Sequence, residues 1–224
     1  MAMKDVTIIV PARNEEKSLP ILLKRLLKLT KNIIVIDNDS TDSTFSIAKK
    51  YCKALKNERN FGKGYSIRRG CREAKTLIIV MMDADLSHKP SDVQKLVQPL
   101  LYDKKIGLVV GSRALGGSEE YVPSKLFGNM FFTRVFNLVW QKKFTDVLNG
   151  FKAFRKDITT DLRSNKYDIE VELVGACLRH GYKVKEIPAY EIARRSGKSK
   201  LNKVFDSILI LMQIFVQRYK SIFR

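Results

Sequence analysis

The sequence predicts an α/β protein with a mostly parallel central sheet and helices on both of its faces. Three observations support this fold class. Short apolar runs alternate with segments whose apolar residues recur at helical spacing. Hydrophobic residues make up 45% of the chain, enough to build a core. No internal repeat or Pro/Gly-rich linker divides the 224 residues, a length that suits one domain with a small addition.

The first half of the chain supplies the alternation of strands and helices. Residues 6–10 form an unbroken apolar run, which is typical of a buried parallel strand. Ser18 and Pro20 suit the first turn of the helix that the leucine spacing predicts over 19–27. The same patterns predict strands at 33–36, 77–82 and 106–111, and helices at 43–51, 64–74 and 90–101.

The second half of the chain is less regular. Its patterns predict helices at 127–140, 169–180 and 201–222, and short strands at 151–154 and 184–188. The last helix is apolar around most of its circumference at its centre, and basic residues follow. We therefore expect one compact domain at 1–200 and a C-terminal amphipathic helix at 201–224.

The chain is strongly basic, with 42 Lys and Arg residues against 23 Asp and Glu residues and a formal net charge of +19. Such a charge favours a polyanionic partner: a nucleic acid, an anionic membrane or a phosphorylated substrate. No apolar run approaches the roughly 20 residues that cross a bilayer, which excludes a multispan membrane protein. The first residues lack the layout of a signal peptide, so we expect the protein to stay where it is made.

Polar clusters follow three of the predicted strands, at 11–16, 37–42 and 83–85. Ligands of parallel sheets bind beyond the carboxyl ends of the strands, so each cluster lies where a nucleotide would meet the sheet. Asp, Asn and Ser also favour helix caps and turns, and this alternative stays open for any single cluster. Three clusters in the same position favour a nucleotide site.

Asp83 and Asp85 carry the most specific chemistry. Two carboxylates that leave a strand two residues apart can bind one hard cation. Mg²⁺ and Mn²⁺ prefer one or two carboxylates together with phosphate oxygens. Such an ion would neutralise the charge that builds on a diphosphate leaving group. The pair therefore predicts a divalent cation, Mg²⁺ or Mn²⁺, as cofactor.

Other chemistries have less support. The string NFGKG at 60–64 places glycines before a helix, where anions bind, but it is not the P-loop pattern. Only His88 and His180 are present, without a Ser-His-Asp or Cys-His constellation, and the three cysteines are too scattered for a zinc site or disulfide framework. No helix-turn-helix, zinc or RNP-type signature supports a nucleic-acid-binding module.

In this order, the clusters resemble glycosyltransferase family 2. The matching strings are VPARNEE, IDNDSTDST, NFGKG, MDADLSH, VVGSR, FTDVLNGFKAF and RRSGKSKL, which extend from residue 6 to about residue 201. Within the family, the chain looks most like polyprenyl-phosphate glycosyltransferases such as the dolichol-phosphate mannose synthases. The resemblance implies the Rossmann-like GT-A fold, with the catalytic domain at 1–200.

The resemblance implies a nucleotide-sugar site in the first half of the chain. The loop after the first strand would contact the nucleotide, and Asp37 would recognise the base or the ribose. Asp83 and Asp85 would bind the metal ion and the diphosphate. The expected nucleotide-sugar residues are Pro11, Arg13, Asn14, Glu15, Asp37, Asp39, Lys63, Asp83, Ala84 and Asp85.

The resemblance also implies an acceptor-phosphate site, made by Arg113, Lys125, Arg194 and Lys200. Arg194 and Lys200 would belong to a basic loop that closes over the phosphates. The expected catalytic residues are Asp85, Arg113 and Asp146. For Asp146 two roles stay open, contact with the sugar or acceptor and the capping of a turn.

Three places depart from the family pattern. Ser87 stands where these synthases often have Gln, which leaves the metal coordination open. Asn38 and Asp39 differ from the usual Asp-Asp-Gly or Asp-Asp-Asn, which leaves the base, guanine or uracil, open. Lys125 stands where an arginine is common, and it would hold a phosphate as a point charge without the bidentate fork.

The resemblance implies an inverting, metal-dependent transfer of a sugar to a polyprenyl (dolichyl) phosphate, with mannose from GDP-mannose as the first expectation. A phosphate monoester is largely ionised near neutral pH and needs no general base. One alternative has UDP-glucose or UDP-GlcNAc as donor. Another has a sugar hydroxyl as acceptor, with Asp146, Glu170 or Glu172 as the base.

A lipid acceptor favours a membrane-interfacial position for the last helix, with its cations toward anionic lipid. Burial against the domain or a partner subunit is the alternative. We expect a peripheral enzyme at the cytoplasmic face of the membrane. The aromatic residues of 127–140 suit the core and a second membrane-facing surface equally. A homodimer or a small membrane partner also stays open.

Overall fold

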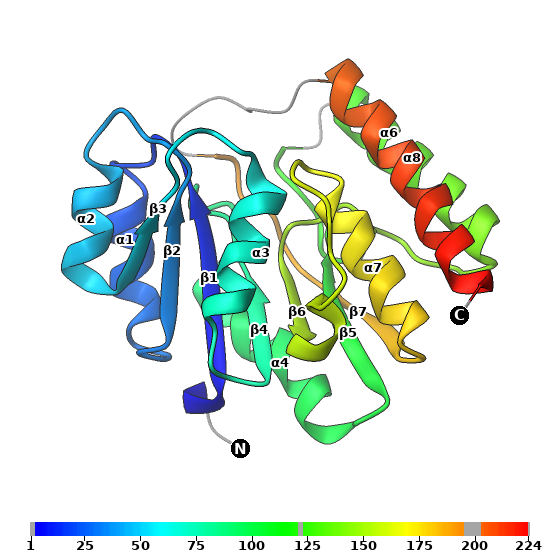
Figure 1. Cartoon of the computed structure of the whole chain (residues 1–224), viewed down its shortest axis with the longest axis horizontal. Helices are drawn as coiled ribbons and strands as arrows, with labels where there is room; N and C mark the ends of the chain where they lie inside the picture. The colour runs from blue at the N-terminus through cyan, green and yellow to red at the C-terminus, as the bar shows by residue number, and fades with distance from the viewer. Residues whose placement is uncertain (1–2, 121–122, 195–202, 224) are drawn as a thin grey trace.

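Strands and helices alternate in the computed structural model, which describes residues 3–120, 123–194 and 203–223 (Figure 1). The strands are β1 (Val6–Ala12), β2 (Ile33–Asp37), β3 (Lys53–Lys56), β4 (Ile78–Met81), β5 (Ile106–Ser112), β6 (Lys152–Arg155) and β7 (Lys183–Pro188). The α-helices are α1 (Leu19–Leu26), α2 (Thr44–Tyr51), α3 (Lys63–Glu73), α4 (Val93–Tyr102), α5 (Arg113–Gly116), α6 (Pro123–Trp140), α7 (Ile169–Arg179) and α8 (Lys203–Ile222). Short 3₁₀ helices cover Met3–Asp5, Pro90–Asp92 and Lys156–Thr159.

The strands of the described ranges form one sheet in the order β3-β2-β1-β4-β6-β5-β7. β6 runs antiparallel to its neighbours β4 and β5, and every other pair is parallel. Helices cover both faces of the sheet (Figure 1). The predicted α/β class with a mostly parallel sheet is confirmed.

The sheet separates two apolar layers. Val6, Ile8 and Val10 of β1 face the layer that contains the buried residues of α1 and α4. Ile9 faces the opposite layer, which contains buried residues of α3, α6, α7 and α8. Successive side chains of a strand point to opposite faces, so an unbroken apolar run such as β1 serves both layers.

The sequence did not predict one strand, β3, and one α-helix, α5. β3 has the sequence KALK, whose two apolar residues do not stand out from a loop, and it pairs only with β2 at the edge of the sheet. α5 is a single turn that begins where β5 ends, and Ser112 caps it by accepting a hydrogen bond from the backbone N–H of Leu115 at 3.3 Å. This turn fixes the position of Arg113, its first residue.

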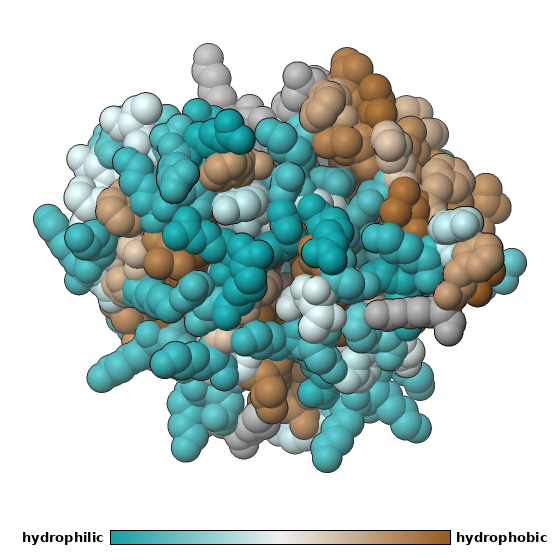
Figure 2. All heavy atoms as spheres, in the orientation of Figure 1, coloured by the Kyte–Doolittle hydropathy of each residue, from teal (hydrophilic) through white to brown (hydrophobic). Residues whose placement is uncertain are grey.

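The predicted C-terminal helix is confirmed over Lys203–Ile222, as α8, which packs against α6 and α7. Its inner side buries Ile210 and Ile214 but also the polar Asp206 and Gln217. Its outer side exposes large apolar side chains, as α6 does, and Figure 2 shows this apolar region over both helices. We name it the α6/α8 surface; it comprises Leu126, Phe127, Met130, Phe131 and Leu138 of α6 and Val204, Phe205, Ile208, Met212, Phe215, Val216, Tyr219 and Ile222 of α8.

No helix within the described ranges combines the length and the apolar character that crossing a membrane requires. The side of α8 that carries Ile210 and Ile214 packs on the domain, and the large apolar side chains of its outer side stay exposed.

Candidate active site

A cavity of about 310 Å³ opens at the carboxyl edge of the sheet, where β1, β2 and β4 end. The predicted site residues that line it are Pro11, Arg13, Glu15, Lys63, Asp83, Ala84, Asp85 and Arg194. Asn60, which belongs to the NFGKG string, also lines it, as do Lys166, Tyr167, Phe205 and Asp206, which the sequence did not single out. The last two belong to α8, so the C-terminal helix contributes to the wall of this cavity.

The loop after β1 is fastened to the loop after β2 by hydrogen bonds. The backbone N–H of Asn14 donates to Ser40 Oγ at 2.9 Å, and that of Glu15 donates to Thr44 Oγ1 at 2.7 Å. Asn14 Oδ1 accepts from the backbone N–H of Thr41 at 2.9 Å. Asn14 has a φ of 52°, in the left-handed region that asparagine tolerates. These bonds hold Glu15 in the cavity wall. The side chain of Asn14 bonds to the neighbouring loop and does not line the cavity.

Asp37 lies behind the cavity wall. Its carboxylate is fully buried and accepts hydrogen bonds from the backbone N–H and the hydroxyl of Ser40. Neither Asp37 nor Asp39 lines the cavity. In their place the wall contains Asn38 and Asn60, and Asn38 Nδ2 donates to Asn60 Oδ1 at 2.6 Å. The contact of Asp37 and Asp39 with a base or ribose stays a prediction.

Asp83 and Asp85 each face a cationic side chain of their own. Lys63 Nζ lies 2.8 Å from Asp83 Oδ1 and 2.7 Å from Glu170 Oε1. Arg194 Nη2 lies 2.9 Å from Asp85 Oδ2. Burial acts against the charged form of Asp83, but Lys63 outweighs it and lowers the pKa of this carboxyl. Burial likewise opposes the charge of Lys63, but Asp83 and Glu170 together raise the pKa of its amine.

The two carboxylates fit a divalent cation that also binds phosphate oxygens. No three His, Cys, Asp or Glu side chains converge on a metal site in the part of the chain that is described. Asp83 and Asp85, which both line the cavity, would hold the cation from the protein side, and a substrate diphosphate would supply further oxygens, as is common for Mg²⁺. Ser87 donates its backbone N–H to Asp85 Oδ1 at 3.0 Å, which orients that carboxylate.

Arg113 forms a two-pronged ion pair with Asp146. Its Nε lies 2.7 Å from Asp146 Oδ2, and its Nη2 lies 3.0 Å from Oδ1. Asn129 Nδ2 donates to the same Oδ1 at 3.1 Å. Burial disfavours the charged form of Asp146, but Arg113 outweighs it and lowers the pKa of this carboxyl. Asp146 is therefore ionised and orients the guanidinium of Arg113.

The other candidate bases are engaged as well. Glu170 accepts from Lys63, as described above. Glu172 is fully buried and accepts from the backbone N–H groups of Arg163 and Ser164 at 2.8 to 3.0 Å. Each of the three carboxylates that the sequence offered as a base for a sugar hydroxyl is thus bound to a donor of the protein.

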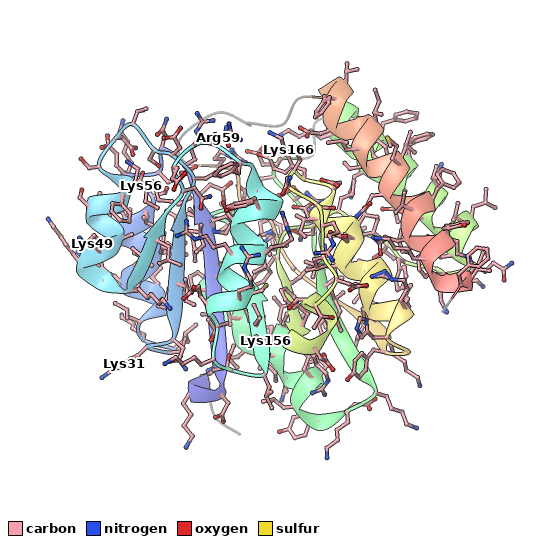
Figure 3. The ribbon with its side chains drawn as sticks, viewed as in Figure 1. Lys31, Lys49, Lys56, Arg59, Lys156 and Lys166 are labelled. Carbon is pink, nitrogen blue, oxygen red and sulfur yellow. The ribbon has the colours of Figure 1, made fainter. Side chains whose placement is uncertain are left out.

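Glu120 brings two of the predicted acceptor-phosphate residues together. Lys125 Nζ pairs with Glu120 Oε2, and the backbone N–H of Arg194 donates to Glu120 Oε1 at 2.9 Å. Lys200, the fourth predicted member, lies outside the described residues. The positive charge of the chain also extends beyond this region. Figure 3 shows Lys166 near the carboxyl ends of the parallel strands, and Lys31 and Lys156 near their amino ends.

Lys152 of β6 is a buried cation that the sequence did not reveal. Its Nζ donates to the backbone carbonyl oxygens of Val147, at 3.1 Å, and of Asn149. Burial lowers its pKa to about 8. Lys152 therefore ties down the segment that follows Asp146. Nothing in the sequence of this short strand distinguishes Lys152 from a lysine that points to solvent.

Comparison with known sequences identifies relatives. The model of glycosyl transferase family 2 matches residues 7–163. The chain is 29% identical over 245 residues to a UDP-N-acetylglucosamine–dolichyl-phosphate N-acetylglucosaminyltransferase of Methanococcus voltae, over 94% of this chain and 97% of that enzyme. It is 31% identical over 211 residues to a dolichol-phosphate mannosyltransferase of Pyrococcus furiosus, over 88% of this chain and 59% of that enzyme.

Comparison with solved structures finds the same fold. One neighbour is glucosyl-3-phosphoglycerate synthase from Mycobacterium tuberculosis, in complex with Mn²⁺, UDP-glucose and phosphoglyceric acid. The TM-score is 0.77 at 19% sequence identity, over 96% of this chain and 80% of that one. At this identity the likeness concerns the fold, and it supports the expected GT-A class.

Proposed function

The chain belongs to glycosyltransferase family 2, and from this premise we propose that it transfers a sugar from a nucleotide-diphosphate sugar to the phosphate of a polyprenyl or dolichyl lipid. One observation carries the proposal: Asp146, Glu170 and Glu172 are all bound to donors of the protein. A sugar hydroxyl needs a base to remove its proton. A phosphate monoester, with its second pKa of about 6, is already a nucleophile at neutral pH.

On the donor side, Asp83 and Asp85 would hold Mg²⁺ or Mn²⁺, which supplies positive charge next to the diphosphate leaving group. Lys63 and Arg194 already lie within 3 Å of these carboxylates and line the same cavity. They are therefore placed to bind the diphosphate with charge-assisted hydrogen bonds.

On the acceptor side, Arg113 would bind the lipid phosphate, with its guanidinium oriented by Asp146. Lys125 and Lys200 would add positive charge to the same region. Positioning of two negatively charged groups and their electrostatic stabilisation are then the main contributions of the protein to the rate. Attack in line with the departing diphosphate inverts the anomeric centre of the sugar.

The donor has three candidates, of which UDP-glucose stays an alternative from the sequence. GDP-mannose is the expectation from the sequence, and a relative named as a dolichol-phosphate mannosyltransferase supports it. UDP-GlcNAc is the second, because the relative named for this donor matches nearly its full length. A thermal-shift series with GDP-mannose, UDP-GlcNAc and UDP-glucose, each with Mg²⁺ or Mn²⁺, separates them, since the bound donor raises the melting temperature.

We also propose peripheral binding to a membrane through the α6/α8 surface. A patch of this kind is rare on a protein without an apolar partner, and Phe205 belongs both to this surface and to the cavity wall. A lipid chain in the membrane would thus lie next to the site where its phosphate reacts. The cytoplasmic face of the membrane stays the predicted location.

The test is incubation of the protein with each radiolabelled nucleotide-sugar and either dolichyl phosphate or dolichol. We expect label in the lipid extract with dolichyl phosphate and none with dolichol, which has a hydroxyl in place of the phosphate. Label on dolichol would favour a hydroxyl acceptor. No labelled lipid with any of the three donors would refute the proposal.

A further inference from the structure

His88 is a buried histidine that the proposed reaction does not use. It follows Asp85 by three residues in the loop after β4 and is 4% exposed. Its ring stacks on Phe151, with centroids 4.8 Å apart and planes inclined by 14°. Its Nε2 lies 3.0 Å from Oδ1 of Asn149, which belongs to the segment between Asp146 and β6.

The hydrogen bonds of Asn149 fix the tautomer of this histidine. Asn149 Nδ2 donates to the backbone carbonyl oxygen of Gly111. Asn149 Oδ1 accepts from the backbone N–H of Phe151 at 3.1 Å, so the orientation of the amide is determined from both ends. Oδ1 can only accept, and His88 Nε2 must therefore carry the hydrogen and donate it.

The other ring nitrogen of His88, Nδ1, makes no hydrogen bond to a described residue that would explain a histidine at this position. His88 Nδ1 is buried and has no hydrogen-bond partner among the described residues. A buried polar atom without a partner destabilises a fold, so a phenylalanine would stack on Phe151 at lower cost. The Nε2–H bond to Asn149, which a phenylalanine cannot make, is therefore the contact that accounts for a histidine at this position.

This bond joins the two halves of the site. His88 belongs to the loop that carries Asp83 and Asp85. Asn149 bonds to Gly111, which lies near the end of β5, two residues before Arg113. The chain of contacts from His88 through Asn149 to Gly111 thus runs from the donor side to the acceptor side, across the carboxyl edge of the sheet.

We propose that His88 is a positioning residue whose Nε2–H bond to Asn149 sets the spacing between the donor-binding loop at Asp85 and the acceptor-binding Arg113. The inference rests on the proposed transfer to a lipid phosphate. A displacement of about 1 Å between two reacting groups can lower a rate by about 100-fold, even when each group still binds its own ligand.

The kinetic test compares His88→Phe, which keeps the stacking, with His88→Gln, whose amide can still donate to Asn149. His180→Phe is the matched control, because His180 lies at the end of α7, outside the cavity lining. For His88→Phe we expect kcat of transfer to fall about 10- to 100-fold, while the Kd of the nucleotide-sugar stays within about twofold. His88→Gln should restore most of kcat, and His180→Phe should match the wild type.

Two kinetic results would overturn the inference. One is a His88→Phe enzyme that transfers at the wild-type rate. The other is a parallel loss of donor binding in His88→Phe that His88→Gln does not repair, because this would indicate a role in the fold or in donor binding alone.

A second measurement does not depend on the acceptor. The chain has only two histidines, and His180 Nδ1 lies 2.9 Å from the carbonyl oxygen of Ala176, so His180 should carry its hydrogen on Nδ1. Long-range ¹H–¹⁵N spectra at about pH 8, where an ordinary imidazole is neutral, should show opposite tautomers for the two rings. An Nδ1–H tautomer for His88 would refute the proposed Nε2–H bond to Asn149, even if the enzyme is active. Absence of any transfer by the wild type would instead refute the proposed function. The bond between His88 and Asn149 would then be tested by the tautomer measurement alone.

Discussion

Arg113 and Asp146 meet through two parallel hydrogen bonds, Nε to Oδ2 at 2.7 Å and Nη2 to Oδ1 at 3.0 Å. Asp146 is fully buried, and the side chain of Arg113 is 17% exposed. A carboxylate held in this way orients a cation and does not remove protons. The pair therefore favours an acceptor that arrives already ionised.

Asp146→Asn should destabilise the protein by about 3 kcal/mol at neutral pH, because it removes the charge of the buried carboxylate that binds Arg113, whose contact with Glu191 is longer, at 3.5 Å. The pKa of Asp146 is lowered in the folded state, so its contribution is present above the ordinary carboxyl pKa of about 4 and is lost as pH falls through the lowered value. Urea denaturation of both proteins at about pH 7 and about pH 3 measures this.

The matched control for that experiment is Asp92→Asn, which removes a surface pair with an exposed Lys95 and should change the free energy of unfolding by less than about 1 kcal/mol. Equal effects of the two substitutions at neutral pH would contradict the role assigned to the Arg113–Asp146 pair.

Asp85→Asn should abolish transfer and leave the fold intact. The substitution removes one of the two proposed metal ligands and the partner of Arg194. In the wild type, Mn²⁺ with the correct nucleotide-sugar should raise the melting temperature, and in Asp85→Asn this increase should be absent. A variant with a wild-type increase in melting temperature and wild-type transfer would show that Asp85 does not bind a metal ion that the reaction needs.

Lys152→Met tests the buried cation beside the site. The pKa of Lys152 is about 8 in the folded state, below its ordinary value of about 10.4. Between these values the unfolded state binds more protons, so the wild type should gain stability relative to Lys152→Met as pH rises from about 8 to about 10. The gain should approach about 3 kcal/mol. Lys31→Met, at the opposite edge of the sheet (Figure 3), should show no such dependence.

Replacement of both Met212 and Phe215 by Glu should weaken binding to vesicles of anionic phospholipid by about 10-fold or more. Each of these side chains is more than half exposed on α8, and burial of one large apolar side chain contributes about 1.5 to 3 kcal/mol. Co-sedimentation measures the effect. Leu77→Glu alters an apolar residue that is 69% exposed beside β4, outside the α6/α8 surface, and should bind as the wild type does. Loss of binding in this control would indicate general instability.

Sequence patterns predicted the main strands and about half of the cavity lining, because apolar runs and the polar residues that follow them are local signals. Asp83 and Asp85 were found in this way. Pairings between distant residues leave no such signal, so the contact of Lys63 with Glu170, 107 positions apart, could not be predicted. Asp37 ends β2 at the edge of the sheet that faces the cavity, but its carboxylate accepts a hydrogen bond from nearby Ser40 and does not line the cavity, which the sequence could not show.

The exposed face of α8 was also beyond sequence reasoning. Apolar residues surround most of the helix, and only the packed structure shows that Gln217 lies inside while Met212 and Phe215 lie outside. Gln217 is tolerated there because it donates to Glu172 at 3.3 Å and accepts from Arg179 at 2.6 Å.

The central claim is that the acceptor phosphate is the nucleophile and that no carboxylate of the protein acts as base. The most direct test is the pH dependence of kcat/KM with dolichyl phosphate and with a dolichyl phosphonate, whose second pKa is higher. Because kcat/KM reports the ionisation of the free enzyme and the free acceptor, the acid limb should move to higher pH with the phosphonate. An acid limb that stays at the same pH for both acceptors would show that a group of the enzyme removes the proton, and would contradict the account.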